Sequence, residues 1–122
     1  MGSKKSMVQD VLDLLKKQKY ACALTGRQLT PQTAELDHIS PVSKNGSDDI
    51  VNLQILHKDI NRMKRTMGNT EFIDVCFEVV QYLAMSDPQA ASRLLKIATL
   101  LTTRDELSNQ QLAISSMETK HE

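Results

Sequence analysis

The sequence predicts an α+β fold in which two short antiparallel strands and a helix are embedded in a mainly helical domain. Apolar residues recur at helical spacing over several long stretches, and two short extended runs lie close together in the first third of the chain. The 122 residues include no Trp, and only 3% are aromatic. The core must therefore be aliphatic, which suits packed helices.

The first part of the chain reads as a helix followed by a ribbon. Apolar residues at spacings of three and four predict an amphipathic helix over residues 5–19, with lysines at its C-terminal end where the helix dipole favours cations. Residues 20–24 and 33–39 then have strand character and flank turns at Thr25-Gly26 and Thr30-Pro31. We expect these two runs to pair with each other.

A turn-rich loop over residues 40–49 leads into a predicted helix over 51–66, ended by Gly68. The inward stripe of that helix would be formed by Ile50, Leu53, Leu56, Ile60 and Met63.

The remainder of the chain is predicted to be helical. One helix is expected over residues 70–85, and Ser86-Asp87-Pro88 is a strong start for the next. Thr103 and Glu106 have capping-box spacing and predict the start of a last helix that runs towards Met117. We expect one domain over residues 1–122, made of an N-terminal helix, a central unit at 20–66 and a helical extension at 67–117.

Charge is balanced overall but not along the chain. Residues 1–65 hold 11 Lys and Arg against 7 Asp and Glu, whereas residues 66–122 hold 4 against 8. A basic first half is where a polyanion site is expected. No apolar run is long enough to span a bilayer. Cys22 and Cys76 are expected to be buried thiols in a reducing compartment, so the cytoplasm is the expected location.

Asp37 and His38 could supply two requirements of phosphodiester cleavage. An imidazole can accept a proton from water near neutral pH, and a carboxylate can hold a divalent cation. Neighbouring residues on a regular strand point to opposite faces, so a bend at the strand end would be needed to bring both into one pocket.

Two asparagines could complete such a site. In a helix, Asn52 and Asn61 would lie about 2.5 turns apart and share no face, so we expect different roles. Asn61 could offer an amide oxygen to a metal, and Asn52 could hydrogen-bond to the loop and hold His38 in place.

The segments LDHISPVSKNG, NLQILHKDIN and RMKR, preceded by ACALTG, resemble the HNH endonuclease family and its ββα-metal motif over residues 21–66. The resemblance implies metal-dependent hydrolysis of DNA. It implies that Asp37 and Asn61 bind the metal, that His38 is the general base and that Asn52 orients the site. It also implies the variant of the family that has His, Asn and Asn at its three signature positions.

The sequence departs from many relatives because it has no paired CxxC motifs. No four-ligand zinc site can be assembled at the usual spacing, so we expect no structural zinc. One carboxylate and one amide oxygen, completed by water and phosphate, suit Mg²⁺ or Mn²⁺.

Other polar residues near the motif have two readings. His57 and Glu35 could be auxiliary groups of the metal site, although a structural histidine and a solvated strand residue are the simpler interpretations. The cations are expected to contact DNA phosphates rather than only water; they are Lys58, Arg62, Lys64 and Arg65.

Three functional hypotheses follow. The first is an HNH-type DNA endonuclease, which could act as a homodimer or within a larger nuclease complex. The second is an inactive module of the same fold that binds DNA or a protein partner. The third is a helical interaction protein in which Asp37-His38 is incidental.

Overall fold

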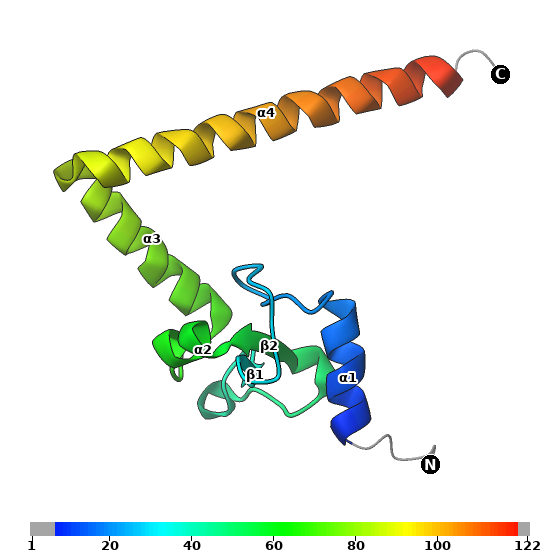
Figure 1. Ribbon diagram of the computed structural model, residues 1–122, viewed down its shortest axis with the longest axis vertical. Helices are drawn as coiled ribbons and strands as arrows, with labels where there is room; N and C mark the ends of the chain where they lie inside the picture. The colour runs from blue at the N-terminus through cyan, green and yellow to red at the C-terminus, as the bar shows by residue number, and fades with distance from the viewer. Residues whose placement is uncertain (1–6, 120–122) are drawn as a thin grey trace. The chain divides into compact units, whose positions relative to one another are not determined.

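The computed structural model describes residues 7–119, and it confirms the α+β class: four α-helices accompany one two-stranded antiparallel sheet (Figure 1). Contacts divide the chain into two compact units, Met1–Val75 and Cys76–Glu122. The expectation of a single domain stays a prediction. No helix within the described residues has the length and apolar character to cross a membrane.

The sheet pairs β1 (Ala34–His38) with β2 (Leu53–His57), so one of the two predicted strands was wrong. In their register Asp37 lies opposite Gln54, and His38 lies opposite Leu53. Residues 20–24 form no strand and contribute only an isolated bridge between Ala21 and Gln28.

The helix expected over residues 51–66 was also wrong. A 3₁₀ turn (Ile50–Asn52) leads into β2, and α2 covers only Lys58–Lys64. The three central residues of β2 are all buried. A strand covered on both faces has this pattern, whereas a surface helix exposes part of every turn. The apolar residues of the buried strand β2 and of α2 together have the spacing of one longer helix, which explains the wrong prediction.

Helix α1 (Met7–Lys17) lies against β2, and Gln18, directly after the helix, supplies part of the pairing that β2 lacks on its open edge. The Gln18 side chain accepts from Ile55 N at 2.9 Å and donates to Ile55 O at 2.8 Å. An amide side chain therefore imitates a third strand at this point. The core of the first unit consists of Leu14, Cys22, Leu29, Ile55, Leu56, Ile60 and Phe72.

Two further helices follow. Helix α3 (Asn69–Ser86) matches the prediction for 70–85, and Asp87 caps α4 (Pro88–Thr119) by accepting from Gln89 N at 3.0 Å. The predicted helix start at Thr103 was wrong, because α4 is continuous through it. The Thr103 hydroxyl donates to Thr99 O at 3.0 Å, which is an interior-helix contact rather than a cap.

Candidate functional site

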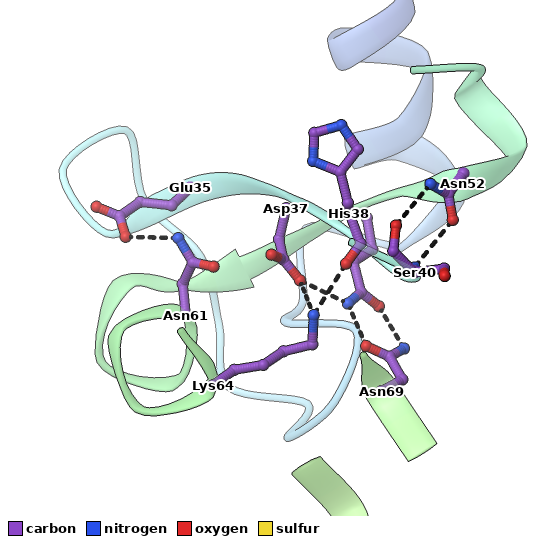
Figure 2. A network of polar contacts seen from close by, with 9 residues as sticks. Glu35, Asp37, His38, Ser40, Asn52, Asn61, Lys64 and Asn69 are labelled. Carbon is purple, nitrogen blue, oxygen red and sulfur yellow. Dashed lines mark hydrogen bonds and ion pairs between the residues drawn. The ribbon is translucent and has the colours of Figure 1, made fainter. Parts of the chain in front are cut away.

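Asp37 and His38 occupy the end of β1, and their side chains leave the strand in opposite directions (Figure 2). Asp37 Oδ2 accepts from Lys64 Nζ at 2.7 Å and from Gln54 Nε2 at 3.0 Å. On the other side, His38 Nε2 lies 2.8 Å from Asp48 Oδ1. The strand thus keeps its regular alternation through His38, without the bend that was expected to turn both side chains into one pocket.

Both residues nevertheless border one cavity of about 270 Å³. Its other walls come from the loop after β1 and from the end of α2 with the residues that follow it. They are Pro41, Val42, Ser43, Lys64, Arg65, Thr66 and Met67.

Asn52 ties the loop to the start of β2. Its Oδ1 accepts from Ser40 N at 3.0 Å, and its Nδ2 donates to Ser40 O at 3.0 Å (Figure 2). The Nδ2 also donates to Ser47 O at 2.7 Å. The Asn52 main chain also accepts from Ile39 N at 2.8 Å. These four bonds hold the segment directly after His38, although Asn52 sits on a 3₁₀ turn and not on the expected helix.

Asn61 comes from α2 and meets Glu35 of β1. Its Nδ2 donates to Glu35 Oε1 at 3.1 Å, and Arg62 Nη2 lies 3.6 Å from Glu35 Oε2. Glu35 and Asp37 are two residues apart on β1, so they share the face that α2 covers. In Figure 2 the amide oxygen of Asn61 is turned away from Glu35, to the side where Asp37 lies.

Lys64 lies in the interior, and this differs from the expected phosphate contact. Its side chain is 1% exposed, and its ammonium donates to Asp37 Oδ2 and, at 2.9 Å, to His38 O. In this arrangement the ammonium is paired with Asp37, and a phosphate contact of Lys64 stays a prediction. Arg62 and Arg65 are exposed and Lys58 is half-buried, so these three cations are more accessible to solvent than Lys64 is.

Sequence reasoning missed two partners of the central pair. Gln54 is buried in β2, and its amide exchanges hydrogen bonds of 2.7 and 3.0 Å with Asn69 while it also donates to Asp37. A glutamine inside the apolar run LQIL was the available signal, because a buried amide needs partners. Asp48 gave no comparable signal, since an acidic residue in a loop is usually solvated.

His57 and Cys22 have structural roles in the first unit. His57 Nδ1 accepts from Asp59 N at 3.1 Å and so caps α2, which agrees with the simpler reading of this histidine. Cys22 is buried as expected, whereas Cys76 is exposed. Burial raises the pKa of the Cys22 thiol, but hydrogen bonds from the Thr25 hydroxyl and from nearby backbone groups outweigh it and hold the pKa below its ordinary value.

The oxygen atoms near α2 are of the chemical types that a hard divalent cation prefers as ligands. Asp37 and Asn61 offer a carboxylate and an amide oxygen from adjoining elements, and Glu35 adds a carboxylate. Within residues 7–119 no three His, Cys, Asp or Glu side chains cluster as metal ligands. A cation here would therefore take its remaining ligands from water or phosphate, as Mg²⁺ commonly does.

Comparison with known proteins agrees with this geometry. The family model described as HNH endonuclease matches residues 22–67, which contain both strands, α2 and the four residues of the motif. No curated protein matches the chain. Residues 22–67 of this chain therefore match the HNH endonuclease family.

Proposed function

We propose that residues 22–67 hydrolyse DNA phosphodiester bonds with the help of a divalent cation, Mg²⁺ or Mn²⁺. The observation that supports this best is the cavity that Asp37 and His38 border together, with a loop fixed by Asn52 as one of its walls. An HNH domain suggests a nuclease, and the basic first half of the chain suits a polyanionic substrate.

His38 is the proposed general base. A carboxylate can only accept a hydrogen bond, so the contact with Asp48 favours a proton on Nε2. The neutral ring then keeps Nδ1 as the atom that takes a proton from water. Asp48 fixes the tautomer in this proposal, and the Asn52 contacts fix the loop beside the ring.

Asp37 and Asn61 are the proposed metal ligands, with Glu35 holding the Asn61 amide in orientation. When bound, the cation would neutralise charge on the phosphate and the departing oxygen. Of the exposed cations, Arg65 borders the cavity and is the best placed for a phosphate; Arg62 and Lys58 are proposed to contact the backbone further away.

A plasmid-nicking assay with Mg²⁺, Mn²⁺ or EDTA tests this function. The wild-type chain should nick with either metal and not with EDTA, and His38→Ala should abolish nicking because the base is lost. His57→Asn is a matched control, since Asn also caps helices and His57 takes no part in the proposed chemistry. Full activity of His38→Ala would refute the assigned base.

One observation favours the alternative of an inactive DNA- or protein-binding module. Asp37 already has an internal cation as partner, the Lys64 ammonium. The same assay separates the two functions, because an inactive module would bind DNA without nicking it under any metal condition. The cytoplasmic location stays a prediction.

We also propose that α4 pairs with α4 of a second copy. The helix has no buried residues, and Leu100, Leu107 and Ile114 recur every seven positions with exposures of 70%, 60% and 56%. A seven-residue apolar repeat on an open helix is typical of helix pairing.

The charges of α4 favour an antiparallel arrangement. Along α4 every cation precedes every acid; the cations are Arg93, Lys96 and Arg104, and the acids are Asp105, Glu106 and Glu118. Antiparallel pairing centred between residues 105 and 106 brings Arg93 opposite Glu118 of the other copy and Ile97 opposite its Ile114. This register also sets Asp105 opposite Glu106, whereas parallel pairing would set all six charges opposite their own copies.

A further inference from the structure

Lys64 is a buried cation held directly on the carboxylate of Asp37. Its Nζ lies 2.7 Å from Asp37 Oδ2 and 2.9 Å from His38 O, and the side chain is 1% exposed. Asp37 itself is 11% exposed in its side chain and takes a second donor from Gln54 on the same oxygen. The negative charge of Asp37 is therefore already neutralised by the chain itself.

This arrangement conflicts with a dication on the same carboxylate. A divalent ion bound to Asp37 would stand within a few ångström of the Lys64 ammonium, in an interior that screens charge poorly. Like charges so close together oppose each other strongly, so both cannot share Asp37 in this arrangement.

We propose that Lys64 is an internal counter-ion that occupies the cation position on Asp37 and is displaced when a divalent metal binds. The inference rests on the proposed function only in taking Asp37 as the metal ligand. Lys64 is thus a positioning residue that keeps Asp37 ordered before metal arrives and lowers the apparent metal affinity, since each binding event must first release the ammonium.

The surroundings of Lys64 give the released ammonium a place to go. Lys64 is the last residue of α2 and borders the cavity together with Asp37, His38 and Arg65. Its four-carbon stem is flexible, so the ammonium can turn from Asp37 into the cavity without unwinding the helix. There it would meet the phosphate that the proposed function brings to the same cavity.

Calorimetric titration of Mn²⁺ tests the proposal without reference to cleavage. Lys64→Met keeps most of the stem and removes the charge, so it should bind Mn²⁺ roughly tenfold tighter or more, a size in line with outer-partner effects at metal sites. Arg65→Met is the matched control, because it removes one positive charge from the same cavity and leaves the Asp37 contact intact. Its affinity should change much less.

The outcomes separate this proposal from the proposed function. The counter-ion role would be overturned if Lys64→Met bound Mn²⁺ no more tightly than the wild type, or if Arg65→Met gained as much affinity. The proposed nuclease function would still stand in that case if the wild type bound Mn²⁺ and nicked DNA. No Mn²⁺ binding by either chain would overturn both.

A second measurement guards against poor folding of Lys64→Met, which leaves a buried carboxylate unpaired. Lys64→Gln retains a donor for Asp37 and serves as the milder variant, with the same expected gain in affinity. In the wild type, amine labelling read by mass spectrometry should find Lys64 protected without metal and reactive with saturating Mg²⁺, while Lys58 is unchanged. Protection that persists with Mg²⁺ would contradict displacement.

Discussion

Replacing Asn52 tests how far the loop beside His38 depends on one side chain. Asn52→Ala removes three side-chain hydrogen bonds, two to Ser40 and one to Ser47. Each is worth about 1 kcal/mol net. Because these groups are near solvent, water replaces part of the loss, and we expect the first unit to lose about 1.5–3 kcal/mol of unfolding free energy. For a unit of this size the Tm should fall by roughly 10 °C.

The two tyrosines allow the first unit to be followed by itself. Tyr20 lies in the first unit and Tyr82 in the second, and the chain has no Trp. In a Tyr82→Phe background, urea unfolding monitored by tyrosine fluorescence therefore reports on the first unit. Asn109→Ala, on the exposed surface of α4, is the matched control and should leave that transition in place.

Asn52→Asp adds a second test. It keeps the acceptor for Ser40 N but sets a carboxylate oxygen against Ser40 O and Ser47 O, so its loss should be at least as large as that of Asn52→Ala. A loss below about 0.5 kcal/mol for Asn52→Ala would show that the loop is held by its main-chain bonds, and the reasoning would then be wrong.

Three further predictions concern other parts of the chain. In a Cys76→Ser background the thiolate absorbance at 240 nm should titrate at lower pH in the folded chain than in the urea-unfolded chain, because the folded state lowers the pKa of Cys22. The resulting stability is gained as pH rises from the lowered pKa towards the unfolded pKa and lost as pH falls through the lowered pKa; a folded midpoint above the unfolded one would contradict this. Leu107→Lys should weaken self-association in light scattering more than Leu107→Glu, since antiparallel pairing sets this position beside Arg104 of the other copy; the reverse order would exclude that register. Gln18→Ala should cost about 1–2 kcal/mol in the same tyrosine-monitored unfolding, because it leaves Ile55 N without a partner while Ile55 O keeps only its bond from Ala23 N; an unchanged transition would show that water replaces the amide fully.

Elements with one strong periodic signal could be predicted from the sequence. Helices α1 and α3 have amphipathic spacing and clear ends, and the structure has them at nearly the predicted residues. Strand β2 could not be recognised, because Leu53, Leu56 and Ile60 fit a helical stripe equally well, and only the burial of both strand faces decides between the two. At Thr103 a cap signal lay inside a helix, where local residues cannot decide whether the chain continues.

In the candidate site, too, some features could be predicted from the sequence and others could not. The order of Asp37, His38, Asn52 and Asn61 was visible in the sequence, and the family match covers all four positions. The contacts of these residues were not visible. The pairing of Lys64 with Asp37 crosses 27 positions and follows from where α2 packs on β1, which no local pattern encodes.

The hydrogen bonds of the Gln18 amide determine where the chain can be shortened at its N-terminal side. The family match begins at residue 22, yet the partner that closes the free side of β2 lies four residues earlier, and Leu14 of the core lies earlier still. A fragment cut at the family boundary would leave the Ile55 amide on the free edge of β2 without its partner, and an unpaired strand edge promotes intermolecular β-sheet and aggregation. The smallest piece that can be expected to stay monodisperse at this edge starts with α1.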